Sequence, residues 1–94
     1  MSDLDQRPIP VLQRQPHYPF SARHRGIEGH VDVRFVVGVD GRVRDVRVVE
    51  GAPPEVFNEA ALAAVRDWRF KPARVNDRNV AASMQVRIRF ALER

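Results

Sequence analysis

The alternation of apolar and polar residues predicts two strands in the first half of the chain. Every second residue from Val31 to Val37 is valine or phenylalanine, which is the period of a half-buried strand. Asp40 and Gly41 follow, in a position typical of a hairpin turn. We therefore expect a second strand from about Arg42 to Glu50, antiparallel to the first.

The second strand contains one interruption of this pattern. Val43 is out of phase with Val46 and Val48, so a regular strand would send it to the opposite face. A bulge near Arg44 and Asp45 would bring all three valines to one face. The sequence therefore predicts a bulge at this point.

Two segments have the features of helices. Pro19 suits the first position of a short helix that runs through Arg25 and is stopped by Gly26. A longer helix is expected to begin in "GAPPE" and to end before Pro72, which cannot continue it. Its apolar residues recur at helical spacing: Val56, Phe57, Ala60, Ala61, Ala64, Val65 and Trp68.

The clearest strand lies at the end of the sequence, from Met84 to Leu92. Its even-numbered residues are apolar, and the odd-numbered Gln85, Arg87 and Arg89 are polar. Before it, "NDRN" is expected to form a turn or loop. At the other end, residues 1–14 are expected to be a flexible or extended tail, with a short extended piece at 9–12, and residues 15–94 to be the folded domain.

These elements predict an α+β fold. The linker of about thirty residues between the second and third strands is long enough for a helical crossover. A right-handed crossover carries the last strand to the free side of the first, which gives a three-stranded antiparallel sheet of order 2-1-3 with both helices on its apolar face. The third strand is then an edge. We expect Trp68 to lie in the core with Phe35, Phe57 and Phe90.

Composition limits the classes of function. The 94 residues suit one domain, with net charge +4 and basic residues that are all arginine except Lys71. Arginine favours carboxylate and phosphate partners, although a solvated surface explains the charge equally well. There is no cysteine for a disulfide or thiol chemistry, no apolar run long enough to span a bilayer, and no signal-peptide pattern.

The side chains suggest no catalytic or metal site. His17, His24 and His30 lack the i, i+4 spacing of helical metal ligands. The serines lie outside any nucleophile motif, and the glycines form no phosphate-binding loop. We therefore expect a non-enzymatic domain with no cofactor, no metal and no small-molecule substrate.

Two features exceed what a generic fold requires. The last strand is expected to be an edge without proline, bulge or inward charge, so it could be open to a guest strand. The stretch "QPHYP" holds Tyr18 on a stiff, extended segment between Pro16 and Pro19. The tyrosine could line a docking surface or simply cover the core, and the two roles are compatible.

Taken together, these motifs resemble the C-terminal domain of the TonB family, over residues 13 to 92. The resemblance rests on the order and spacing of several parts: "QPHYP", the glycine-led strand "GHVDVRFVV", the turn at Asp40 and Gly41, "WRF-P" from Trp68 to Pro72, and the closing "VRIRFAL". The sequence departs from the family in the loop at 76–79, where a glycine is common.

The resemblance implies a function in the periplasm of Gram-negative bacteria. TonB proteins are anchored in the inner membrane and pass energy from a proton-driven motor to outer-membrane transporters for iron chelates, haem or cobalamin. Their C-terminal domain grips the TonB box of the transporter, which adds as a strand beside the last strand. The resemblance thus implies that partner binding uses these residues: Gln15, Tyr18, Pro19, Met84, Gln85, Val86, Arg87, Ile88, Arg89 and Phe90.

Other interpretations remain open from the sequence. A domain of the same fold could serve a sensor or a TolA-type bridge, and the domain could be a monomer or a strand-exchanged homodimer. Whether the chain is an excised domain or a soluble relative also stays open. A nucleic-acid binder would use the arginines of the outer sheet face, but that face lacks the aromatic residues on which bases stack. Its acidic residues also alternate with arginines, which favours pairing across strands, so we expect no nucleic-acid partner.

Overall fold

A computed structural model describes residues 5–93 of the protein, and the described part contains both helices and strands. None of its helices is long and apolar enough to cross a membrane. The elements, in chain order, are β1 (Ile9–Leu12), α1 (Phe20–His24), β2 (Gly29–Val37), β3 (Val43–Ala52), α2 (Asn58–Arg66), β4 (Arg69–Lys71), β5 (Ala73–Val75), β6 (Arg78–Val80) and β7 (Ala82–Phe90).

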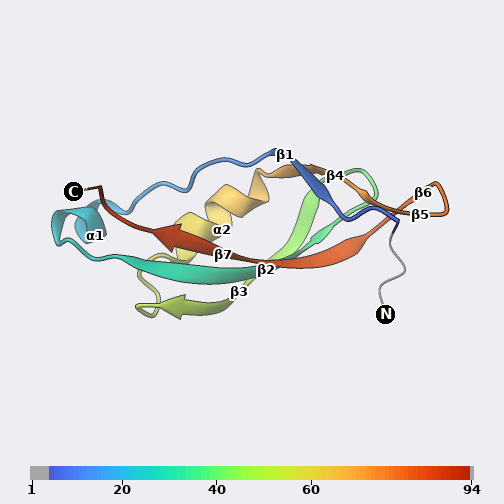
Figure 1. The fold of residues 1–94 in the computed structure, drawn as a ribbon. Helices are drawn as coiled ribbons and strands as arrows, with labels where there is room; N and C mark the ends of the chain where they lie inside the picture. The colour runs from blue at the N-terminus through green and yellow to red at the C-terminus, as the bar shows by residue number, and fades with distance from the viewer. Residues whose placement is uncertain (1–4, 94) are drawn as a thin grey trace.

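The main sheet is antiparallel and has the order β3-β2-β7. In Figure 1, α2 lies across one face of this sheet and α1 lies at one end. The α+β fold and the strand order 2-1-3 are thus confirmed, because the chain passes from β3 through α2 to the far side of β2. β2 and β7 each begin two residues earlier than the sequence pattern predicted, and β7 ends at Phe90 instead of Leu92.

The bulge expected in β3 is present. Two steps along β2, from Arg34 to Val36, are matched by three steps along β3, from Arg47 to Arg44. Asp45 accommodates the extra residue with a φ of 52°. A second irregularity, which the pattern did not predict, gives Val49 no opposite residue in β2. As a result of the first bulge, three valines are half-buried against the core: Val43, Val46 and Val48.

The second helix begins later than expected. The apolar spacing suggested a start in "GAPPE", but the chain makes a turn there and α2 starts at Asn58. Glu55 has a φ of 67°, which a right-handed helix cannot include. Val56 and Phe57 nevertheless contact the core, and Phe57 is fully buried. The apolar periodicity at these two positions therefore reported burial and not helix.

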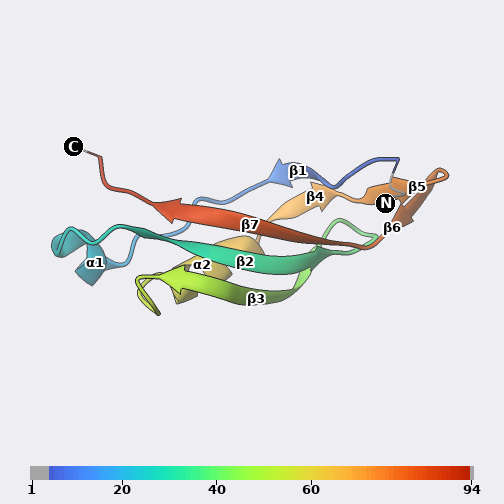
Figure 2. The same cartoon turned by 60° about the horizontal axis from the view of Figure 1, so that its bottom comes forward.

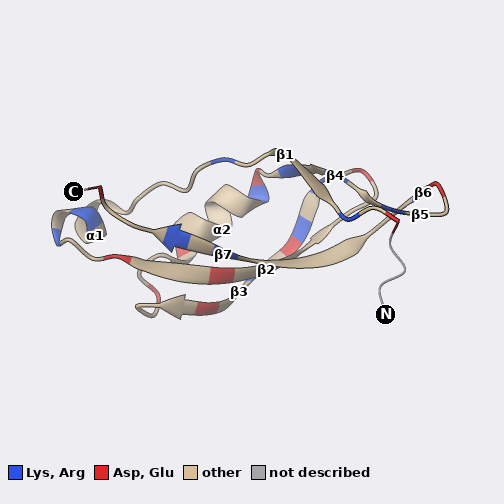
Figure 3. Cartoon of the chain, viewed as in Figure 1, with Lys and Arg blue, Asp and Glu red and all other residues tan. Residues whose placement is uncertain are grey.

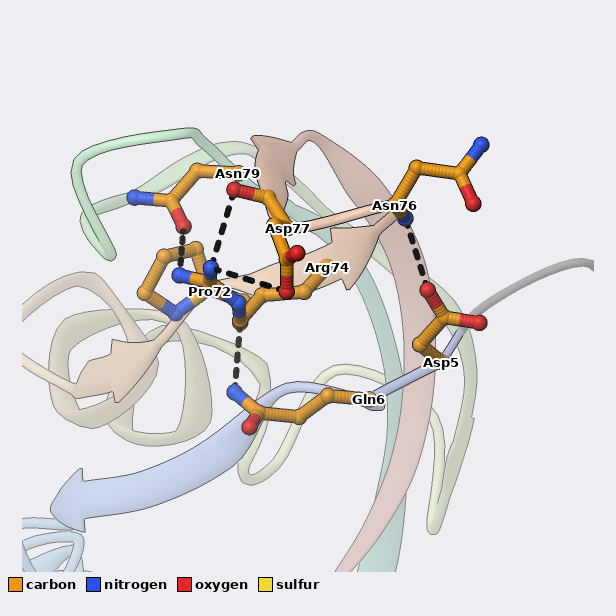
Figure 4. A network of polar contacts seen from close by, with 7 residues as sticks. All are labelled: Asp5, Gln6, Pro72, Arg74, Asn76, Asp77 and Asn79. Carbon is orange, nitrogen blue, oxygen red and sulfur yellow. Dashed lines mark hydrogen bonds and ion pairs between the residues drawn. The ribbon is translucent and has the colours of Figure 1, made fainter.

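The short strands attach the N-terminal segment to the rest of the domain. The extended piece predicted at 9–12 is β1, which pairs antiparallel with β4, a strand the pattern did not predict (Figure 2). Further back, the side-chain amide of Gln6 donates to the carbonyl of Pro72 at 3.0 Å, and the carboxylate of Asp5 accepts from the Asn76 N–H at 2.6 Å (Figure 4). Residues 5–12 are therefore held against the segment from β4 to the turn after β5.

The first half of the polar segment "NDRN" is a tight hairpin turn, and its second half, Arg78 and Asn79, already belongs to β6. Asn76 and Asp77 both have positive φ, 49° and 65°, and connect β5 to β6. Two positive φ values in a two-residue loop are typical of the turns that match the twist of a hairpin. Arg74 secures the hairpin by donating to the side chain of Asn79 and to the carbonyl of Asp77, at 3.0 and 2.9 Å (Figure 4). The expected turn is therefore confirmed, with a short strand on each side.

The core contains two groups of aromatic rings. Trp68 is 7% exposed, and its ring lies edge-on to Phe35 at 6.1 Å and tilted to Phe70 at 6.3 Å. Phe57 and Phe90 instead stack on each other, with centroids 4.3 Å apart. The prediction that Trp68 is core is confirmed. Of the three rings expected beside it, Phe35 is in contact with the indole, whereas Phe57 and Phe90 stack on each other and the second ring beside the indole is Phe70 of β4.

Candidate functional site

The last strand has an open edge. Among residues 5–93, β2 is the only strand that pairs with β7, and the register is continuous over nine residue pairs without a bulge. β7 contains no proline, so none of its residues lacks a backbone N–H donor. Burial alternates along the strand as predicted: Met84, Val86, Ile88 and Phe90 face the core, while Gln85, Arg87 and Arg89 are exposed.

Two of the outward side chains of β7 are tied to β2. Arg87 donates from Nε and from a terminal nitrogen to the two carboxylate oxygens of Asp32, at 2.8 and 3.1 Å. This hydrogen bonding lowers the pKa of Asp32 and raises the pKa of Arg87. Arg34 donates to the amide oxygen of Gln85 at 3.0 Å. By contrast, Arg89 forms no ion pair within the described residues.

The "QPHYP" stretch reaches the core through Tyr18. The tyrosine ring makes edge contacts with Phe57 at 5.5 Å and with Phe90 at 5.8 Å, and its hydroxyl donates to the carbonyl of Ile27. The guanidinium of Arg23 lies 5.0 Å from the ring centroid, a cation–π distance. Tyr18 therefore links the segment before α1 to the end of β7 and to the connection between α1 and β2.

The chain before Tyr18 is held at a second point. The indole Nε1–H of Trp68 donates to the carbonyl of Arg14 at 3.0 Å. The guanidinium of Arg14 lies 4.0 Å from the carboxylate of Asp67, at the C-terminal end of α2. The segment between Arg14 and Tyr18 is thus anchored at both ends, with Gln15 and His17 exposed between the anchors.

Between this segment and the end of β7 lies a groove of about 570 Å³. Figure 1 shows the two chain segments that border it, with α1 at its end. The groove is lined by residues of the stretch itself, of α1 and of the end of β7: Gln15, Pro16, His17, Tyr18, Phe20, Arg23, Arg89, Phe90 and Ala91. The groove and the open edge share Arg89 and Phe90, so they form one continuous surface.

The structure thus brings together most of the residues expected to bind a partner. Gln15 and Tyr18 line the groove with Arg89 and Phe90, whereas Met84 to Ile88 continue along the open edge away from it. Pro19 occupies the N-cap position of α1. It was expected to be the first residue of the helix, but the helix begins one residue later, at Phe20.

Among the lining residues that sequence reasoning missed are the two on α1, Phe20 and Arg23. Phe20 is 79% exposed, the largest exposure among the large apolar residues of the described chain, and its ring stacks on His24 at 6.0 Å. Arg23 combines a place in the groove with its contact on Tyr18. A helical projection of α1 could have found both, because Ala22 is the buried residue of that helix and leaves Phe20 and Arg23 on other faces.

The family described as Gram-negative bacterial TonB protein C-terminal has a profile that matches residues 14–92. The chain belongs to this family. It is 36% identical to Protein TonB of Pseudomonas aeruginosa over 90 residues, which are 96% of this chain and 25% of that protein. It is 37% identical to Protein TonB of Escherichia coli over 67 residues, which are 71% of this chain and 28% of that protein. The chain thus spans about a quarter of the length of these TonB relatives.

Solved TonB structures have the same fold. The solution NMR structure of the Pseudomonas aeruginosa TonB C-terminal domain superposes with a TM-score of 0.79 at 34% identity, covering 100% of this chain and 91% of that one. A Helicobacter pylori TonB C-terminal domain superposes with a TM-score of 0.62 at 29% identity, covering 84% and 71%. The family resemblance that the sequence suggested is therefore confirmed.

Proposed function

We propose that the chain is the periplasmic binding domain of a TonB-type energy transducer. It grips the TonB box of an outer-membrane transporter and thereby drives uptake of iron chelates, haem or cobalamin. Parts of the full protein beyond these residues would anchor it in the inner membrane and connect it to the proton-driven motor. In this proposal the domain is non-enzymatic and needs no cofactor, because its task is to hold a peptide while force is transmitted.

The open edge of β7 carries this proposal. A guest strand that adds to an edge gains its affinity from main-chain hydrogen bonds, and side-chain pockets beside the edge add specificity. β7 offers nine residues in regular register, and the groove beside its end offers aromatic and polar side chains. The guest is therefore proposed to contact these residues: Gln15, Tyr18, Pro19, Met84, Gln85, Val86, Arg87, Ile88, Arg89 and Phe90.

The charges at the edge favour an acidic guest at one end. Arg87 is neutralised by the Asp32 carboxylate, whereas Arg89 has no ion pair within residues 5–93 and lines the groove together with Arg23. Charge at such a rim changes the association rate and its salt dependence more than the final affinity. Replacing Arg89 with glutamine should therefore flatten the salt dependence of binding more than replacing Arg87.

A second copy of the chain and a nucleic acid are the two alternative partners. A second copy of the chain could add its own strand to the same edge, which would give a strand-exchanged homodimer. A nucleic acid would have to use the outer sheet face, where Asp32 already pairs with Arg87 and Arg34 with Gln85. Only the charge of Arg87 is neutralised there, so these pairings do not decide between the partners. A peptide is favoured because the outward residues of β2 and β7 include no phenylalanine, tyrosine or tryptophan on which bases could stack.

Amide hydrogen exchange tests the proposal residue by residue. In an antiparallel ladder, alternate residues direct their N–H groups to opposite sides of a strand. Adding a synthetic TonB-box peptide from a TonB-dependent transporter should therefore slow exchange at alternate amides of β7, either the even- or the odd-numbered set. The amides of β3, at the other edge of the sheet, should be unchanged and provide the internal control.

A proline variant then tests necessity. Proline at one of the newly protected amides removes a donor to the guest, and should abolish peptide binding while the near-ultraviolet circular dichroism of Trp68 persists. A guest peptide N-methylated at alternate residues should lose binding for one set only. Strand addition is wrong if the peptide protects consecutive amides, if it protects α2 or β3, or if the proline variant binds normally. Analytical ultracentrifugation of the free protein tests the homodimer alternative, because a strand-exchanged dimer sediments with twice the mass of the 94-residue chain.

A further inference from the structure

Three potential metal ligands converge on the sheet face opposite α2. His30 and Asp32 are two residues apart on β2, so their side chains point to the same face. Glu50 lies directly opposite Asp32 in the register of β3. One donor atom from each of the three side chains lies within 4.8 Å of the others. Figure 3 shows the acidic positions of β2 and β3 next to each other on this part of the sheet.

The imidazole of His30 lacks a hydrogen-bond partner. Its Nε2 atom is shielded from solvent and makes no hydrogen bond within the described residues, although the side chain as a whole is 25% exposed. The nearest charged group is the Oε1 atom of Glu50, at 3.7 Å, which is too far for a hydrogen bond. A buried polar atom without a partner calls for an explanation, and an ion between the two groups would provide one.

The carboxylate of Asp32 is held in position from the other side. Arg87 donates to both of its oxygens and keeps the group ionised, and the Asp32 side chain is only 14% exposed. Each carboxylate oxygen has a second lone pair, so the contact with Arg87 does not use up its capacity as a ligand. A partner that orients a ligand in this way is typical of metal sites in proteins.

We propose that His30, Asp32 and Glu50 bind a divalent transition-metal ion such as Zn²⁺. One imidazole nitrogen and two carboxylate oxygens suit Zn²⁺ and its neighbours, whereas Mg²⁺ and Ca²⁺ prefer oxygen ligands alone. Three protein ligands leave a further position for water. We expect the site to bind Zn²⁺ more weakly than a closed site with four protein ligands. The positive charge of Arg87, which contacts Asp32, lowers the affinity further. The ion would join β2 to β3 at the end of the sheet where the groove lies.

Calorimetric titration of Zn²⁺ into the chain without an affinity tag tests this site. The expected result is one saturable site per chain, with Mg²⁺ and Ca²⁺ giving none. His30→Gln should abolish saturable binding. His24→Gln is the matched control, because His24 lies on α1 and stacks on Phe20 away from the cluster. In NMR spectra the imidazole nitrogens of His30 should shift on Zn²⁺ addition, while those of His24 stay unchanged.

Glu50→Gln provides a second variant, since the Glu50 side chain is 64% exposed and its replacement should not disturb folding. It should weaken Zn²⁺ binding at least tenfold, and Zn²⁺ should raise the melting temperature of the parent but not of either ligand variant. The proposal is overturned if the parent shows no saturable Zn²⁺ binding, if His30→Gln binds as the parent does, or if Mg²⁺ or Ca²⁺ binds equally well. Equal losses in His24→Gln and His30→Gln would also overturn it.

Discussion

Replacing Trp68 with alanine should strongly destabilise the domain. The indole is 7% exposed and fills the space beside Phe35 and Phe70, so its removal leaves a cavity that the surrounding strands cannot close. Large aromatic deletions of this kind cost about 3–5 kcal/mol. The indole N–H also donates to Arg14, and losing a hydrogen bond of this type adds about 0.5–1.5 kcal/mol. The expected loss is therefore a large part of the roughly 5–15 kcal/mol that stabilises a domain.

Urea denaturation followed by far-ultraviolet circular dichroism measures this loss, since the variant lacks the only tryptophan of the chain. With a total loss of about 3.5–6.5 kcal/mol and an m value of about 1–1.5 kcal/mol per molar urea, the midpoint should fall by about 2–6 M. If Trp68→Ala does not fold at all, Trp68→Phe gives the measurable case. It keeps a ring beside Phe35 but loses the hydrogen bond to Arg14, and should cost about 1–2 kcal/mol.

Val49→Thr is the matched control, because Val49 is 48% exposed at an irregularity of β3. Its free energy of unfolding should stay within about 0.5 kcal/mol of the parent. A loss below about 1 kcal/mol for Trp68→Ala, or a loss equal to that of Val49→Thr, would refute the reasoning. It would mean that the indole does not fill the core between α2 and the sheet as described.

Three further variants test other parts of the structure. Tyr18→Ala should fold but bind the TonB-box peptide more weakly than Tyr18→Phe in a calorimetric titration, and equal affinities would make the ring purely structural. Gly41→Ala should lower the free energy of unfolding, measured in urea, by more than about 1–2 kcal/mol. Gly41 has a φ of 81°, and a Cβ there would lie 2.0 Å from the Phe70 carbonyl oxygen. An unchanged free energy of unfolding would contradict this. Asp32→Asn, with EDTA present, should lower the melting temperature by an amount that is constant above about pH 5 and shrinks as the pH falls below 4. The reason is that the hydrogen bonds from Arg87 lower the pKa of Asp32 below its ordinary value of 3.8. The stabilisation is therefore complete above that ordinary value and is lost as the pH falls through the lowered one. A difference in melting temperature that stays constant down to pH 2 would show that the ion pair does not stabilise the fold.

The sequence by itself determined the framework of this protein. Alternation at Val31–Val37 and Met84–Leu92 specified two strands, because a side chain every second residue must face either core or solvent. The phase break after Val43 predicted a bulge near Arg44 and Asp45 for the same reason, and the structure has it there. The family could also be recognised, because its motifs occur in a fixed order along the chain. These features are all local or depend only on spacing.

The tertiary structure decided what spacing cannot encode. The late start of α2 follows from the left-handed backbone at Glu55, a residue whose type does not demand that conformation. The neighbours of Trp68 depend on where β4 docks, and three-residue strands such as β4 carry too little periodicity to be recognised. The contact of Tyr18 with Phe90 depends on how the segment before α1 packs on β7. Glu50 meets His30 and Asp32 through the register of β3 on β2. Contacts across strands depend on pairing that forms only in the folded chain, and so the groove and the ligand cluster had to be found in three dimensions.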